Sequence, residues 1–387
     1  MECDARSGAV SSWQNTDIVK HTDVVIIGAG VIGCALAYEM AQRGLRVRVC
    51  DRRAPGAGAS QASAGVLAPY IEAESRSTLE QLGVRSLELF DEFLSRVVAD
   101  AQQDVPYVRD GTLEVATDDS GLAGLERSWR ALQEEGVECE LLTTAQVREV
   151  EPMIGPLVQA GLVVRPHGAV SVRELVTALV RAALVRRAVF VDACTVRRVR
   201  GGRDAEVETD QGVFRAPTVI LAAGAWGGEL QLERVPAVPV RPVRGQLLAL
   251  AHVSPLPQRV VWGRDCYCVP WSDGRVLVGA TVEDVGFDEH ATLGGVRHLA
   301  AAASRLLPGL EQAVLENVRV GLRPCSPDRL PIVGRSRRLP TLVYATGHYR
   351  NGVLLAPLTA QVVADFVSSG REDPMLEVTC PARLGDL

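Results

Sequence analysis

The clearest pattern near the start of the chain is an apolar run, Val24–Ile27, that has the length of a buried strand. A glycine-rich turn with the spacing GxGxxG follows it at Gly28, Gly30 and Gly33, and an apolar stretch suited to a buried helix comes next. A second short strand then ends at Asp51. This order is typical of a dinucleotide site, in which the phosphates lie at the helix N-terminus and the acidic residue binds ribose hydroxyls.

Two further apolar strands end at small residues, in the segments 218–226 and 342–352. No second GxGxxG motif follows a strand. Three strand ends of this kind suit a long ligand that lies across several strands, so we expect FAD rather than NAD. A flavoprotein without a nicotinamide site takes electrons from its substrate, which favours an oxidase or a dehydrogenase over a reductase.

Apolar residues recur with helical spacing in six later segments. We expect helices at residues 79–98, 122–135, 144–150, 172–185, 293–307 and 355–367. Alternating or short apolar segments predict strands at 107–116, in a meander over 189–219, in a series over 238–282 and at 318–324.

The expected fold class is α/β, or α+β for the chain as a whole, with a Rossmann-like FAD-binding domain interleaved with an antiparallel-sheet substrate domain. We assign the FAD-binding domain to residues 21–100, 165–238 and 321–371. The substrate domain is assigned to residues 101–164 and 239–320. Residues 1–20 are expected to form a disordered tail and residues 372–387 a C-terminal tail.

The composition fits a cytoplasmic enzyme. The 387 residues carry a net charge of -6, so we expect no nucleic-acid partner and no anionic membrane partner. Residues 1–20 lack the apolar segment of a signal peptide, and the apolar stretch 24–40 is too short and too rich in glycine to span a membrane. The nine cysteines contain no CxxC pair and are expected to be reduced. No metal site is expected, because Cys266 and Cys268 have no third ligand nearby.

Lysine is almost missing from the chain. Every basic residue except Lys20 is an arginine. Schiff-base catalysis, attachment of pyridoxal phosphate and a Walker A lysine are therefore excluded for the folded part of the chain. Arginine stays protonated, so these side chains bind carboxylates or phosphates and do not act as general bases.

Three motifs together resemble one family. Residues 58–69 (GASQASAGVLAP), 320–334 (VGLRPCSPDRLPIVG) and 345–357 (ATGHYRNGVLLAP) resemble the glycine oxidases of bacterial thiamine biosynthesis, a branch of the D-amino-acid oxidase-like flavoenzymes. The resemblance extends from about Thr22 to Phe366. It implies noncovalent FAD and the oxidation of glycine, sarcosine and small D-amino acids to the imine or glyoxylate and ammonia, with oxygen reduced to hydrogen peroxide. It also implies that the glycine imine supplies thiazole synthesis, with a thiazole synthase as partner, and by analogy a homo-oligomer, which in many members is a tetramer.

The candidate flavin-binding residues lie in the glycine turn, at the end of the second strand, in the small-residue loop and at the later strand ends. They are Gly28, Gly30, Val31, Ile32, Gly33, Asp51, Arg52, Ser60, Ser63, Ala64, Gly65, Val66, Val196, Ala223, Gly224, Trp226, Gly347, His348, Arg350, Asn351, Gly352, Val353 and Leu354.

The resemblance places the substrate contacts at Tyr267, Arg323 and Arg350. A guanidinium fork and a tyrosine hydroxyl suit an α-carboxylate, and they would place the α C–H against flavin N5 for hydride transfer. No strong base is required if the amine of the substrate binds in its neutral form. His348 has two open interpretations, as a group that gates or polarises the flavin or as a satisfied histidine beside it.

Three alternatives stay open. Sarcosine oxidases are close in kind, but their covalent flavin cysteine would fall near Gly321 and their lysine has no counterpart here. A D-amino-acid oxidase or dehydrogenase for larger substrates is a second alternative. A non-catalytic flavin-binding carrier is the third, although it would have no use for Tyr267, Arg323 and Arg350.

Overall fold

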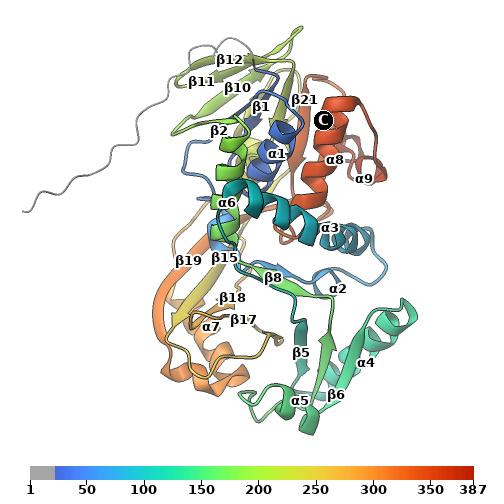
Figure 1. The fold of residues 1–387 in the computed structure, drawn as a ribbon, viewed down its shortest axis with the longest axis vertical. Helices are drawn as coiled ribbons and strands as arrows, with labels where there is room; N and C mark the ends of the chain where they lie inside the picture. The colour runs from blue at the N-terminus through green and yellow to red at the C-terminus, as the bar shows by residue number, and fades with distance from the viewer. Residues whose placement is uncertain (1–21) are drawn as a thin grey trace, which may run out of the picture.

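The computed structural model describes residues 22–387, and its centre is a six-stranded sheet with the order β20-β21-β13-β1-β2-β9 (Figure 1). All neighbouring strands are parallel except β20 and β21, which are antiparallel. The strands are β1 (Val24–Ile27), β2 (Val47–Cys50), β9 (Val189–Val191), β13 (Thr218–Leu221), β20 (Ile332–Arg335) and β21 (Leu342–Thr346).

The side chains of β1 alternate between two cores because successive residues of a strand face opposite sides of the sheet. Val24 and Ile26 lie in a core to which four long helices contribute. Val25 and Ile27 lie in a second core on the other face. The helices are α1 (Val31–Gln42), α3 (Thr78–Ala101), α6 (Val172–Val185) and α8 (Ala356–Ser369). Burial on both faces explains why β1 is apolar at every position.

The second face of this sheet is covered by a four-stranded sheet with the order β12-β11-β10-β14 (Figure 1). Its strands are β10 (Val196–Arg200), β11 (Ala205–Thr209), β12 (Gly212–Ala216) and β14 (Gln231–Leu232). A small sheet of β3 (Val66–Leu67), β8 (Gly168–Val170) and β4 (Tyr107–Val108) lies where the chain passes toward the lower part of the molecule.

The lower part is an eight-stranded sheet with the order β19-β15-β18-β17-β16-β5-β7-β6. Its strands are β5 (Thr112–Ala116), β6 (Cys139–Thr143), β7 (Ala160–Val164), β15 (Arg241–Ala251), β16 (Val260–Trp262), β17 (Tyr267–Trp271), β18 (Arg275–Gly279) and β19 (Val314–Cys325). The long pair β15 and β19 joins the two parts of the molecule, and β19 runs without a break through the domain boundary expected at residues 320–321.

The helices agree with the sequence pattern within a few residues. The helix expected at 172–185 has those bounds, whereas α3 is longer than expected at both ends. The other helices are α2 (Pro69–Glu72), α4 (Asp119–Glu134), α5 (Thr144–Val150), α7 (Leu293–Leu306) and α9 (Pro374–Val378). Short 3-10 turns are η1 (Ala59–Ala62), η2 (Gly224–Glu229), η3 (Pro308–Gln312) and η4 (Pro381–Leu384).

The segment 372–387, expected as a C-terminal tail, forms α9 and η4 and packs on the central sheet. Met375 and Leu387 are buried, and the Thr379 hydroxyl donates to the Val333 carbonyl at 3.1 Å. The tail expected at residues 1–20 lies outside the described residues. Across residues 22–387, none of the helices is both long and apolar enough to cross a membrane.

Candidate active site

A cavity of about 690 Å³ lies at the carboxyl ends of the central parallel strands and extends to β15, β17 and β19. Ligands of open α/β sheets bind at this edge, and the volume is typical of a cofactor site. The lining includes eighteen of the candidate residues, namely Gly28, Gly30, Val31, Ile32, Asp51, Arg52, Ser60, Ser63, Val196, Ala223, Gly224, Trp226, Tyr267, Arg323, His348, Arg350, Gly352 and Val353.

Glycine is needed at the three positions of the turn for different structural reasons. Gly28 has φ +107, and a Cβ there would lie 2.4 Å from the carbonyl oxygen of Ala222. A Cβ at Gly33 would lie 1.9 Å from the carbonyl oxygen of Gly28. At Gly30, which borders the cavity, the nearest atom to such a Cβ is the Ser60 Oγ at 3.6 Å. Gly28 and Gly33 are therefore required by packing of the protein itself, whereas Gly30 leaves room for a ligand.

Asp51 lies directly after β2 and orders the loop around the glycine turn. Its Oδ2 accepts from the Ala29 amide at 2.7 Å, and its Oδ1 accepts from the Arg53 amide at 2.8 Å. The Ser60 Oγ accepts from the Val31 amide at 3.0 Å, in the first turn of α1. These bonds fix the positions of groups suited to the ribose and phosphates of a dinucleotide.

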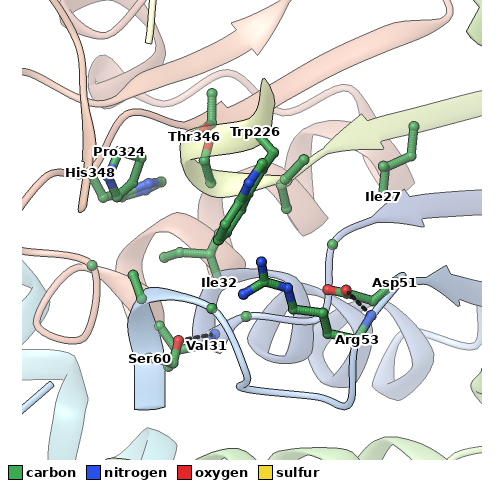
Figure 2. A pocket seen from close by; sticks show the side chains of 18 of the residues that line it. Ile27, Val31, Ile32, Asp51, Arg53, Ser60, Trp226, Pro324, Thr346 and His348 are labelled. Atoms are coloured by element: carbon green, nitrogen blue, oxygen red, sulfur yellow. Dashed lines mark hydrogen bonds between the residues drawn. The ribbon is translucent and has the colours of Figure 1, made fainter. Parts of the chain in front are cut away.

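Trp226 forms a wall in the middle of this half of the cavity. Figure 2 shows its indole above Arg53, with Asp51 on one side and His348 on the other. The guanidinium carbons of Arg53 and Arg52 lie 4.5 and 4.9 Å from the indole ring centre. Arg53 also binds Glu289 through both terminal nitrogens, at 2.9 and 2.6 Å, which connects this half to the segment after β18.

The chemistry of this half fits FAD. The cavity has a glycine turn that opens to it, a carboxylate at the end of β2 and an arginine, Arg198, whose Nε is buried without a hydrogen-bond partner among residues 22–387. An unpaired buried donor of this kind is costly unless a ligand supplies the acceptor.

Arg323 projects from β19 into the other end of the cavity. Its Nη1 donates to the carbonyl oxygens of Thr281 at 2.9 Å and Arg244 at 3.3 Å. No carboxylate lies within ion-pair distance of Arg323 among residues 22–387. Burial lowers the pKa of its guanidinium, which nevertheless stays charged. A buried cation held only by carbonyl groups is suited to binding an anionic ligand.

Tyr267 lies on β17 opposite Gly279 of β18. A Cβ at Gly279 would lie 2.4 Å from the tyrosine ring, so the glycine makes the space that the ring occupies. Trp262 packs against the ring at 4.7 Å between centroids. Burial raises the pKa of Tyr267 to about 12, so the hydroxyl stays protonated and available as a donor.

His348 is buried beside the cavity, and its Nε2 lies 3.1 Å from the Thr359 Oγ1. Burial lowers the pKa of His348 to about 3, so the ring is neutral at ordinary pH. This geometry gives the ring a hydrogen-bonding partner in α8.

Glu72 is a cavity residue that was not anticipated. It ends α2, and its Oε2 lies 3.1 Å from the Arg350 Nε. The side chain of Glu72 is 11% exposed and that of Arg350 is 37% exposed. The contact is an ion pair, and the Glu72 Oε2 is buried without a hydrogen-bond partner among residues 22–387. The only sequence signal was an acidic residue three positions after the small-residue motif ending at Pro69.

Seven candidate residues do not line the cavity: Gly33, Ala64, Gly65, Val66, Gly347, Asn351 and Leu354. Gly65 has φ +75 and its Cβ would meet the Val170 carbonyl oxygen at 1.8 Å. Leu354 accepts a hydrogen bond from Ser86 in α3 through its carbonyl oxygen, at 2.6 Å. The helix expected at residues 355–367 begins at Ala356.

The cysteines on and beside β17 belong to a hydrophobic core. Cys266 and Cys268 are both buried in the core beneath α7, and the Cys266 thiol together with burial raises the pKa of Cys268. Among residues 22–387, no group of three or more histidine, cysteine, aspartate or glutamate side chains could hold a metal ion.

Comparisons with known proteins agree with this geometry. The family profile DAO, described as FAD dependent oxidoreductase, matches residues 23–366. The chain is 36% identical over 362 residues to the bifunctional protein ThiO/ThiG of Trichormus variabilis, with 92% of this chain and 54% of that protein covered, so it spans about half the length of that relative.

Two further similarities cover nearly whole proteins. The chain is 34% identical over 348 residues to the glycine oxidase of Geobacillus kaustophilus, with 89% of this chain and 92% of that protein covered. The crystal structure of glycine oxidase from Geobacillus kaustophilus matches with a TM-score of 0.90 at 32% identity, covering 94% of this chain and 99% of that chain.

Proposed function

The chain belongs to the DAO family of FAD-dependent oxidoreductases, and from this membership we propose that it oxidises glycine, sarcosine and small D-amino acids. From glycine the products are the imine, which hydrolyses to glyoxylate and ammonia, and hydrogen peroxide from oxygen. One observation carries the proposal: Tyr267, Arg323 and Arg350 come from three separate segments and line the same end of the dinucleotide cavity. Similarity to glycine oxidases supports the choice of substrate.

The residues of the nucleotide half would hold FAD without a covalent bond. Gly28, Gly30 and Asp51 would contact the nucleotide portion, while Trp226 and His348 border the middle of the cavity. When bound, FAD accepts a hydride from the substrate and passes its electrons to oxygen.

The residues of the other end would orient the substrate. Arg323 offers a charged donor group to the α-carboxylate, and the protonated hydroxyl of Tyr267 is a second donor. Fixing the carboxylate at two points restricts the position of the α-carbon and so favours a geometry suited to hydride transfer. No strong base is needed if the amine of the substrate binds in its neutral form. His348 is itself neutral, and its Nε2 lies 3.1 Å from the Thr359 Oγ1.

The partners follow from the same assignment. Oxygen is the electron acceptor, and the imine is the product that a thiazole synthase would consume. The relative named ThiO/ThiG carries two named parts in a single chain, which supports a thiazole synthase as the partner. We further propose a cytoplasmic homo-oligomer.

Anaerobic addition of glycine to the purified yellow protein tests the proposal directly. Loss of the oxidised flavin absorbance, followed by peroxide formation when air is admitted, is expected. D-alanine should be a weaker substrate and L-alanine should be inert, because a clamped carboxylate leaves room for the methyl group on one hand only. A protein that stays yellow with all three amino acids would be a flavin carrier.

A further inference from the structure

The charged side chains that line the cavity fall into two groups. Seven come from the loop after β2 and from β10, β11 and η2, in the nucleotide half: Asp51, Arg52, Arg53, Arg197, Arg198, Glu208 and Glu229. The other three are Glu72, Arg323 and Arg350. The substrate end therefore holds two guanidinium groups and one carboxylate.

Glu72 is placed to act on charge at this end. Its carboxylate lies 3.1 Å from the Arg350 Nε, and its side chain is far less exposed than that of Arg350. Burial raises the pKa of Glu72, and the positive charges of Arg350 and Arg323 oppose that rise. We take the carboxylate to be ionised at neutral pH because it is in contact with a guanidinium. The net charge of the substrate end is then one positive charge.

We propose that Glu72 is a specificity-determining residue: by neutralising Arg350, it limits the site to substrates that carry one carboxylate. This inference rests on the proposed function for the class of substrate. One carboxylate, with the amine neutral, brings the substrate end to zero charge. A second carboxylate would leave an uncompensated negative charge in a buried site beside Glu72, which is unfavourable.

The unpaired Oε2 of Glu72 strengthens the discrimination between substrates with one carboxylate and substrates with two. It is a buried acceptor without a hydrogen-bond partner among residues 22–387, so a ligand placed there gains from offering a donor such as an amine N–H. A carboxylate in the same place would bring two sets of acceptors together and would be rejected.

Binding of acetate and malonate to the holoenzyme, read from the perturbation of the flavin absorption spectrum, tests the role of Glu72. The measurement is made at mildly alkaline pH, where both acids are fully ionised. The wild type should bind acetate more tightly than malonate. Glu72→Gln should shift the ratio of the two dissociation constants toward malonate by at least about tenfold. Glu74→Gln, an exposed acid two residues away, is the matched control and should leave the ratio unchanged.

The outcomes separate this inference from the proposed function. The charge-balance role of Glu72 would be overturned if Glu72→Gln weakened the binding of acetate and malonate equally. It would also be overturned if Glu74→Gln shifted the ratio of the two dissociation constants as much as Glu72→Gln does. If Glu72→Gln does not fold, the wild type still decides, since malonate binding as tightly as acetate contradicts the inference. Absence of glycine oxidation with the expected binding ratios would reject the proposed function alone. Oxidation of glycine with D-aspartate as an equally good substrate would reject the role of Glu72 alone.

Discussion

Arg323 is unusual among the arginines of the chain because backbone carbonyls, not carboxylates, hold it. A charge-assisted hydrogen bond contributes about 1.5–3 kcal/mol, so loss of two such bonds to a substrate carboxylate costs about 3 kcal/mol or more. Arg323→Ala is therefore expected to raise KM for glycine by at least about a hundredfold and to slow flavin reduction as well. Steady-state kinetics and anaerobic stopped-flow measurements check the two effects.

Arg323→Lys should restore little of the lost activity, because an ammonium group cannot reproduce the planar fork of the guanidinium. Arg241→Ala is the control: Arg241 is on β15, is 57% exposed and pairs with Asp284 at 3.0 Å. Unchanged glycine kinetics in Arg323→Ala would show that this arginine only supports the fold.

The glycine turn offers a matched pair of substitutions. A Cβ at Gly30 meets no protein atom closer than 3.6 Å, whereas one at Gly33 would lie 1.9 Å from a backbone oxygen. Gly30→Ala should therefore leave the melting temperature of the apoprotein unchanged and weaken FAD binding by at least about tenfold, because the methyl group enters the ligand space. Gly33→Ala should lower the stability of the apoprotein itself, by about 1–3 kcal/mol or more. Fluorescence titration with FAD and thermal unfolding distinguish the two, and full FAD affinity in Gly30→Ala would contradict the assignment.

Sequence patterns could predict the candidate residues that lie in a recognisable local motif. The glycine spacing and the strand before Asp51 are local signals. The family motifs contain Arg323 and Arg350, and the family resemblance supplied Tyr267. Glu72 had no such signal, because its contact with Arg350 joins two residues that are far apart in the chain. Only folding brings a carboxylate of α2 beside the loop after β21.

At the scale of elements, the pair β15 and β19 shapes the substrate end through two glycines. Gly245 and Gly321 lie opposite each other in this pair, and the guanidinium of Arg323 lies across Gly245. A Cβ at Gly245 would lie 2.3 Å from the Arg323 Nη2, the far end of a flexible side chain. The strand pair can therefore keep its register while the guanidinium is displaced.

Gly245→Ala is accordingly expected to raise KM for glycine at least about tenfold with little change in unfolding free energy. Gly294→Ala, in the first turn of α7 with no atom within 4 Å of the added Cβ, is the control and should be neutral. A large loss of stability in Gly245→Ala, with KM unchanged in the folded fraction, would mean that the glycine serves the sheet and not Arg323.

Element types were more predictable than element ends. The amphipathic pattern predicted the bounds of α6 because the apolar face of that helix is regular. The ends of α3 were less predictable, since the helix expected at 79–98 runs from Thr78 to Ala101, and α8 begins at Ala356, one residue after the expected start. The short strand β16 was not resolved as a separate strand within the series expected over 238–282, because three residues carry too little periodicity.

For the whole molecule, the sequence predicted an interleaved arrangement but not the order of the strands. The parallel order of β13, β1 and β2 follows from strand, glycine turn and helix units. In the eight-stranded sheet, β5 pairs with β16 in parallel although more than a hundred residues separate them. Such pairings depend on long-range packing, which a hydrophobic pattern along the chain does not encode.

Two buried neutral histidines make the stability of the whole molecule decrease as the pH falls. His167 is fully buried, its Nδ1 lies 2.7 Å from the Thr112 Oγ1, and its Nε2 has no hydrogen-bond partner among residues 22–387. Burial lowers the pKa of His167 to about 3, and burial has the same effect on His348. These histidines therefore bind protons in the unfolded chain at pH values at which they stay neutral in the folded chain. The stability that depends on a neutral His167 is present above the ordinary pKa of about 6.5 and is lost as the pH falls toward about 3.

His167→Asn should remove the contribution of His167 to the pH dependence of the unfolding free energy, while keeping a polar atom near Thr112. At about pH 5 this contribution amounts to about 2 kcal/mol. The unfolding free energy should therefore fall by about 2 kcal/mol less in the variant than in the wild type between neutral pH and pH 5. Denaturant unfolding at the two pH values measures the difference, and His298→Asn, at an exposed position on α7, should follow the wild type. His167 lies outside the cavity lining, so glycine kinetics at neutral pH should change little. An equal acid response in the wild type and His167→Asn would mean that the histidine is already protonated in the folded state and that the acid sensitivity arises elsewhere.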